Sequence, residues 1–178
     1  MAQDIQPTSE SYHPQDVVFI NTHLIQRAME GLQKSREKFQ ALLEQAELGE
    51  LSVQYDLALR YLEGDGVEAD PVQAAAWLER AAAQDFPRAV SILGNCYEGG
   101  TGVERDPERA VQLYRRAAQQ DYAPAMCNLA VCYLNGIGVA PDPAQGVEWL
   151  QRSAAQDFPR AVSILDCCYR DGDGVEPD

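Results

Sequence analysis

The sequence has little of what catalytic and metal-binding sites are usually built from. Its 178 residues include two histidines, His13 and His23, and neither belongs to an HExxH motif or another metal-ligand pattern. The glycine-rich segments contain neither GxGxxG nor GKS/T, no serine lies in a GxSxG context, and the acidic segment DGDGVEPD at 171–178 lacks the ligand spacing of an EF-hand. The sequence therefore predicts no catalytic residue, no metal site and no cofactor.

Basic residues are also scarce. Asp and Glu number 28 against 14 Lys and Arg, which gives a net charge of −14. Binding to nucleic acid or to an anionic membrane needs basic surface, so this balance disfavours both. The longest apolar runs, such as VVFI at 17–20, are too short to span a bilayer, and the polar opening MAQDIQPTSE shows no secretory signal. We therefore expect a cytoplasmic protein that binds neither nucleic acid nor membrane.

The five cysteines form no recognisable zinc or disulfide pattern. Cys96, Cys132 and Cys168 are 36 residues apart and each precedes a tyrosine, whereas Cys127 and Cys167 lie outside that series. No CxxC pair is present, and an odd number of cysteines without a secretory signal favours reduced thiols. Small apolar packing positions are the interpretation that we prefer over a redox or disulfide role.

A period of 36 residues organises most of the chain. The stretch AAQDFPRAVSIL occurs at 82–93 and again at 154–165, two periods apart. The segment YLEGDGV at 61–67 returns as YEGGTGV, YLNGIGV and YRDGDGV at intervals of 36 residues. Periods of this size indicate a solenoid, in which each unit is stabilised largely by its neighbours.

Each period contains the signals of two helices. An Asp-Pro pair at 70–71 predicts a helix start, because the carboxylate caps unpaired N–H groups and proline fits the first helical position. Apolar residues then follow at i, i+3, i+4, i+7 and i+8 from Ala74, which is one helix face. A second helix is predicted from Pro87 to the glycines at 99–102. No segment shows the sustained alternation of a strand, so the predicted fold is all-α.

The pattern A…LG..Y..G.GV..D..A..W…AA resembles the Sel-one-like repeat, a relative of the tetratricopeptide repeat. It is carried by Ala89, Leu93, Gly94, Tyr97, Gly100, Gly102, Val103, Asp106, Ala110, Tyr114, Ala117 and Ala118, and it returns 36 residues later. Ala58, Ala130 and Asp166 depart from it at the small glycine, and Gly146 replaces an alanine. The resemblance covers about 49–178 and implies a right-handed α-solenoid of antiparallel helix pairs.

The expected organisation has three parts. They are a disordered polar tail over 1–15, a helical cap over 16–48 in which a break would fall near Gly31, and the repeat array over 49–178. Helix pairs are expected at about 50–84, 87–120 and 123–156, followed by a half repeat at 159–178.

The half repeat lacks its second helix in this sequence. We therefore expect its apolar face at Ala161, Leu165 and Tyr169 to be without its usual cover. Solenoid ends normally need a polar cap. This predicts either a truncated product or self-association through the uncapped C-terminal repeat.

The resemblance also implies where a partner would bind. In tetratricopeptide-like arrays the first helices line a concave groove that takes peptides or partner helices. Helical spacing places on this groove Tyr55, Leu59, Leu62, Arg88, Ser91, Asn95, Val131, Leu134, Arg160, Ser163 and Arg170, with Ser52, Glu98, Cys127 and Cys167 beside them. Arginines suit peptide carboxylates and the apolar residues suit side chains. The alternative is that the arginines are solvated and the leucines pack against loops.

The function that these observations favour is a non-enzymatic scaffold or adaptor that binds a protein or peptide. One alternative is a structural fragment of a longer repeat protein. The other is an enzyme, since some cysteine-rich secreted members of the family are linked to penicillin binding or β-lactamase activity. Those members have cysteine pairs within each repeat and a signal peptide, and this sequence shows neither.

Overall fold

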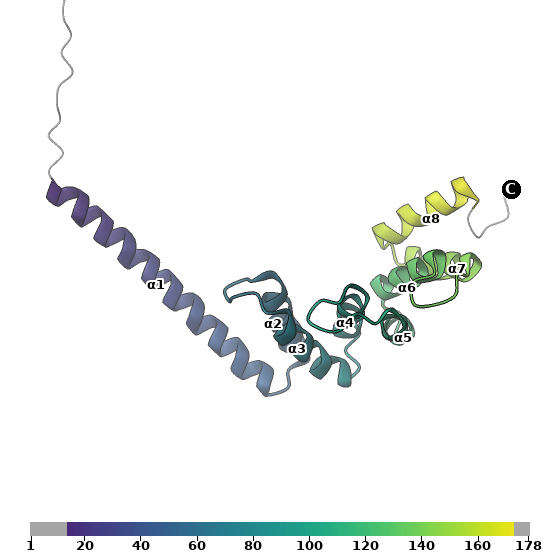
Figure 1. The fold of residues 1–178 in the computed structure, drawn as a ribbon, viewed down its shortest axis with the longest axis horizontal. Helices are drawn as coiled ribbons and strands as arrows, with labels where there is room; N and C mark the ends of the chain where they lie inside the picture. Colours follow the sequence, from purple (N-terminus) through teal and green to yellow (C-terminus); the bar gives the residue numbers. More distant parts are fainter. Residues whose placement is uncertain (1–13, 173–178) are drawn as a thin grey trace, which may run out of the picture. The chain divides into compact units, whose positions relative to one another are not determined.

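The computed structural model describes residues 14–172, and within this range it contains helices and no strand. The elements are α1 (Pro14–Glu47), α2 (Leu51–Glu63), α3 (Pro71–Ala83), α4 (Pro87–Gly99), α5 (Pro107–Ala118), α6 (Ala123–Asn135), α7 (Pro143–Ala154) and α8 (Pro159–Asp171) (Figure 1). The predicted all-α fold is confirmed. The predicted tail over 1–15 lies outside the described residues except for Pro14 and Gln15, which begin α1.

The chain divides into two units, Met1–Gln40 and Ala41–Asp178. In the first unit α1 is unbroken at Gly31, where a break was predicted to fall. A single glycine inside a helix costs only about 1 kcal/mol relative to alanine, which a 34-residue helix tolerates. The last turns of α1 belong to the second unit, where Ala46 is buried and its carbonyl accepts a hydrogen bond from Gln54 Nε2 at 3.0 Å.

The helices of the second unit pack in chain order, each against the next (Figure 1). The antiparallel pairs α2/α3, α4/α5 and α6/α7 follow one another, and α8 is the first helix of a fourth repeat. The predicted 36-residue solenoid is confirmed. None of the helices described between residues 14 and 172 has the length and the apolar content that a membrane span requires.

Each second helix begins at the predicted Asp-Pro pair. The Oδ1 atoms of Asp70, Asp106 and Asp142 accept hydrogen bonds from backbone N–H groups two or three residues on, at 2.9–3.1 Å. The first helices end instead at glycines in the left-handed region, such as Gly100 at φ 75° and Gly136 at φ 68°. The Asp-Pro starts and the glycine ends could both be predicted from the sequence, because each satisfies the unpaired backbone groups of a helix end.

In the loops after α4 and α6, the second glycine fixes how one repeat lies on the preceding one. A Cβ atom on Gly102 would lie 1.9 Å from the carbonyl oxygen of Pro71, and one on Gly138 would lie 2.2 Å from that of Pro107. The loop after α4 therefore touches the first residue of α3, and the loop after α6 touches the first residue of α5. No side chain fits at this backbone contact.

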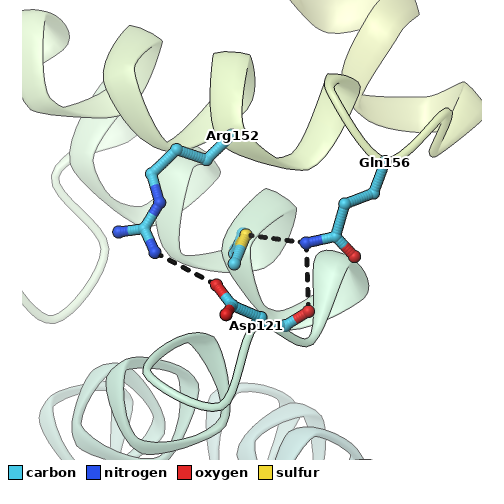
Figure 2. Close-up of polar contacts among 4 residues, drawn as sticks. Asp121, Arg152 and Gln156 are labelled. Carbon is cyan, nitrogen blue, oxygen red and sulfur yellow. Dashed lines mark hydrogen bonds and ion pairs between the residues drawn. The ribbon is translucent and has the colours of Figure 1, made fainter.

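Aspartates with positive φ add a polar link between repeats. Asp121, in the turn between α5 and α6, has φ 56° and pairs with Arg152 of α7 at 3.3 Å (Figure 2). Its carbonyl accepts a hydrogen bond from Gln156 Nε2 at 3.0 Å. One period earlier, Asp85 and Arg116 form the same pair at 2.5 Å. These exposed pairs are each worth at most about 1 kcal/mol, so they set register more than stability.

Two side chains of α8 are more exposed than the equivalent side chains of α4. Val162 and Tyr169 are 48% and 51% exposed, whereas the equivalent Val90 and Tyr97 are buried under neighbouring helices. The prediction of an uncovered face is wrong for Ala161, which is fully buried because it packs into a core shared with α6 and α7. Self-association through α8 stays a prediction.

The loop glycines generate a test of the contact between repeats. Gly66 has φ 73° but only the tip of Arg60 near its Cβ position, at 3.9 Å, so it is the matched control for Gly102. We expect Gly66→Ala to lower the free energy of unfolding by about 1 kcal/mol, from backbone strain alone. Gly102→Ala should lose a further 1 to 3 kcal/mol, roughly, because the Pro71 carbonyl must also move. Urea denaturation followed by circular dichroism measures both, and equal losses would contradict the contact.

Candidate functional site

Two hollows open on the first helices of the last three repeats, and Arg160 lines both. The polar hollow, of about 410 Å³, is lined by Asn95, Glu98, Gly99, Arg105, Asn128, Ile137 and Arg160. The apolar hollow, of about 460 Å³, is lined by Val131, Leu134, Asn135, Pro143, Arg160, Ile164, Cys167 and Cys168. Side chains from α4, α6 and α8 therefore meet around one guanidinium group.

Hydrogen bonds cross the polar hollow from α8 to α4. Arg160 Nη1 donates to Asn128 Oδ1 at 2.6 Å, and Asn128 Nδ2 donates to Asn95 Oδ1 at 3.0 Å. The Tyr114 hydroxyl lies 2.8 Å from Asn95 Oδ1 and 2.7 Å from Glu98 Oε2, and its one proton is donated to one of them at a time. These five residues form a polar ladder across three repeats.

Tyr114 enters the ladder from the core because Gly94 leaves room for its ring. The ring is fully buried, and a Cβ atom on Gly94 would lie 2.5 Å from it. The equivalent positions in the neighbouring repeats hold Ala58 with Leu78 and Ala130 with Leu150. Burial, the hydrogen bond to Glu98 and the charge of that carboxylate raise the pKa of Tyr114, so the hydroxyl stays neutral.

A second glycine shapes the apolar hollow. Gly146 of α7 stands where the pattern has alanine, and a Cβ atom there would lie 2.9 Å from Leu134 Cγ. Leu134 therefore packs against the backbone of α7 and forms part of the wall of the hollow. Val131 and Ile164, also in the wall, are half-buried. This wall offers aliphatic surface next to the charge of Arg160.

Arg88 and Arg160 lie two periods apart, on α4 and α8, and both lack a carboxylate partner within residues 14–172. Among the residues that the structure describes, neither lies within ion-pair distance of a carboxylate, although Arg116 and Arg152 do. Burial raises the pKa of Tyr55, and the positive charge of Arg88 acts in the opposite direction. The net charge of the chain is −14. Two arginines without an ion pair in the described structure, both on first helices of the repeats, are therefore positions where an external anion can bind.

The structure brings together six of the predicted groove residues and buries two others, Ser91 and Cys127. Asn95, Glu98 and Arg160 line the polar hollow, and Val131, Leu134 and Cys167 line the apolar one with Arg160. Ser91 is 2% exposed and faces the core, so its predicted place on the surface is wrong. Steps of three and four residues from Arg88 both fit a helix; the first reaches the buried Ser91 and the second reaches Ile92, which is half-buried.

The other predicted residues lie apart from the two hollows. Tyr55 packs edge-on against Phe86, with ring centroids 5.9 Å apart, and Leu59 and Leu62 are half-buried on α2. Ser163 donates to the Pro159 carbonyl of its own helix at 3.0 Å. Arg170 Nη2 donates to Cys167 Sγ at 3.1 Å.

Sequence reasoning missed Asn128, Arg105, Ile137 and the Tyr114 hydroxyl. Asn128 was missed through the same step of three residues, which selected the buried Cys127 instead. Arg105 and Ile137 lie in the G.G loops, and the approach of those loops to the first helices has no periodic signal. The exchange of Leu78 for Tyr114 one period later was a usable signal, because a tyrosine at a buried position needs a partner for its hydroxyl.

The cysteines in the described part of the chain are all free thiols. Burial raises the pKa of Cys96 and Cys127 and, together with the charge of Glu98, raises that of Cys132 to about 12. Cys167 is exposed and lines the apolar hollow. No group of His, Cys, Asp and Glu side chains within the described ranges could hold a metal ion.

A family model supports the repeat assignment. The model of the Sel1 repeat matches residues 51–86, 87–122, 123–158 and 161–178, and the chain therefore belongs to the Sel1 repeat family. The resemblance to Sel-one-like repeats is confirmed.

Solved structures give the same result. The chain is 36% identical, at a TM-score of 0.75, to c5321, a protective antigen present in uropathogenic Escherichia coli strains, over 79% of this chain and 30% of that one. It is 31% identical, at a TM-score of 0.72, to a Sel1 repeat protein from Oxalobacter formigenes, over 79% and 58%. The chain thus spans less than two thirds of the length of either protein.

Cysteine rich protein B from Helicobacter pylori shares the fold alone. Its TM-score is 0.59 at 20% identity, over 75% of this chain and 96% of that one. No curated protein matches the sequence significantly.

The pair of Gly94 and Tyr114 generates a test of how the ladder is supported. We expect Gly94→Ala to lower the free energy of unfolding by about 1 to 3 kcal/mol, because its methyl group would overlap the tyrosine ring. Adding Tyr114→Leu recreates the alanine–leucine pair of the other repeats and should recover most of that loss. Urea denaturation of the two single variants and the double variant measures the coupling. If the losses of unfolding free energy in the two single variants add up in the double variant, the two side chains do not contact each other.

Tyr114 also predicts a pH dependence. Its pKa in the folded protein lies above the ordinary value of 10.0, so its contribution to stability is present below pH 10 and falls as the pH rises further. We expect the free energy of unfolding of the wild type to fall more steeply than that of Tyr114→Phe between about pH 9 and 11. Urea denaturation at closely spaced pH values measures the two slopes, and parallel curves would contradict the shift.

Proposed function

We propose that this chain is a non-enzymatic interaction scaffold that binds a segment of a partner protein on the exposed face of α4, α6 and α8. Sel1 repeat arrays typically mediate protein–protein interactions, and the chain has four such repeats. The observation that carries the proposal is that two adjacent hollows share Arg160, one lined mainly by polar side chains and the other mainly by aliphatic side chains and cysteines. A surface of this kind distinguishes polar from apolar groups on one ligand.

The ladder favours an extended segment over a helix. Asn95 and Asn128 present side-chain amide groups in the polar hollow, which can pair with backbone N–H and C=O groups of a ligand. An extended chain has such groups free, whereas a helix satisfies them internally. The bonds from Arg160 to Asn128 and from Asn128 to Asn95 hold these side chains in place before a ligand arrives.

Peptide display tests the proposal without knowledge of the natural partner. A library of random peptides is selected on immobilised wild-type protein and on the Arg160→Ala/Asn128→Ala double variant. The control is Arg80→Ala/Gln73→Ala, which likewise removes one arginine and one side-chain amide, from exposed positions of α3. We expect one set of peptides to be enriched by the wild type and the control and lost from the double variant.

Equal enrichment on all three proteins would contradict binding at this surface. Circular dichroism of each variant checks that the helices remain folded. The predicted cytoplasmic location and the alternative of a structural fragment of a longer repeat protein both stay predictions.

A further inference from the structure

We infer that the partner segment presents an acidic side chain and an aliphatic side chain two residues apart, the first on Arg160 at the polar hollow and the second in the apolar hollow. This inference rests on the proposed function and names the chemistry of the ligand. It follows from the charges around the polar hollow, the wall of the apolar hollow and the position of Arg160 between them.

The polar hollow has an excess of positive charge. Arg105 and Arg160 line it together with one carboxylate, Glu98. That carboxylate lies 2.7 Å from the buried hydroxyl of Tyr114, which can donate to it or to Asn95, and Arg105 Nε donates to the Glu98 backbone carbonyl at 2.9 Å. Two guanidinium groups therefore face a hollow whose only lining carboxylate has a partner in the protein. An acidic group of a ligand complements this hollow in a molecule that is otherwise strongly acidic.

Arg160 is oriented for such a group. Among the contacts described for it, its guanidinium makes one hydrogen bond, from Nη1 to Asn128, and no ion pair. The remaining N–H donors of a guanidinium form a planar fork that matches a carboxylate. Because Asn128 is itself bonded to Asn95, the orientation of Arg160 is set by α4 and α6 as well as by its own helix.

The apolar hollow adjoins the same guanidinium. Its aliphatic wall is Val131, Leu134, Pro143 and Ile164, and its volume of about 460 Å³ is more than one branched aliphatic residue needs. In an extended chain, residues i and i+2 project from the same side about 7 Å apart. Because Arg160 lines both hollows, the acid and the aliphatic group lie close together on the ligand, and we assign them to residues separated by one.

An internal side chain fits better than a chain end. The row of first helices continues past the polar hollow to Arg88 of α4, which, like Arg160, has no carboxylate partner among the described residues. A segment that runs along this row has chain on both sides of the acid. We therefore assign the carboxylate to an aspartate or glutamate within the segment.

The test compares peptide selections on single variants. A displayed library of fully random peptides, with the C-terminus blocked by fusion, is selected on the wild type, Arg160→Gln, Leu134→Ser and the control Arg80→Gln. We expect the wild type and the control to enrich acid-x-aliphatic or aliphatic-x-acid sequences. Arg160→Gln should lose the selection for acid and keep that for the aliphatic residue, and Leu134→Ser should do the reverse. Ile164→Ser replaces Leu134→Ser if circular dichroism shows that the latter unfolds.

A synthetic pair of enriched peptides gives the quantitative check. Fluorescence anisotropy compares a glutamate peptide with its glutamine counterpart on the wild type and on Arg160→Gln. We expect a preference for glutamate of roughly tenfold on the wild type, the size typical of a charge-assisted hydrogen bond, and none on the variant.

The outcomes separate this inference from the function on which it rests. Enrichment of basic or aromatic sequences that still depend on Arg160 and Asn128 would overturn the acid–aliphatic assignment and leave the peptide-binding scaffold intact. Enrichment only from a library with free C-termini would overturn the internal carboxylate. If no enriched peptide depends on Arg160, Leu134 or Asn128, both this inference and the proposed function fail.

Discussion

The contact between a loop backbone and the start of a helix in the preceding repeat is the constraint on which the rest of the array depends. Gly102 lies against the carbonyl of Pro71, and Gly138 lies against that of Pro107. These contacts fix how far one repeat is displaced from the next. The polar hollow includes the space between α4 and α6, whose repeats meet at the Gly138 contact, so the separation of those two helices follows from that displacement. The site is therefore as rigid as the stacking beneath it.

Exchanges of side-chain size give each repeat its own surface on this common frame. Gly94 makes room for Tyr114, whose hydroxyl reaches the polar hollow, and Gly146 makes room for Leu134 at the apolar hollow. The first exchange removes volume at Gly94 and adds it at Tyr114, relative to the alanine and leucine of the neighbouring repeats. The repeats thus share one backbone arrangement but differ in the side chains that they present at equivalent positions.

Much of the fold was predictable because its signals are local and periodic. The Asp-Pro pairs, the glycine loops and the apolar faces each act within one helix or one turn. Each signal also recurs every 36 residues, so the copies support the same assignment. The site was predicted less well. Asn95, Val131, Leu134 and Arg160 were selected, but Ser91 was placed at the surface and Asn128 was missed. A helix has 3.6 residues per turn, so spacing alone cannot separate steps of three and four, and only tertiary packing decides which face is covered.

The polar ladder takes its members from three repeats, with Asn95 from the second, Asn128 from the third and Arg160 from the fourth. The polar ladder therefore depends on the order in which the three repeats follow one another, and no single repeat contains it. Exchange of two whole repeats, or insertion of one between α6 and α8, would preserve the period, the caps and the glycine contacts. The same rearrangement would separate the arginine from its asparagines. In such a family, recombination between repeats can change what a protein recognises while its fold stays the same.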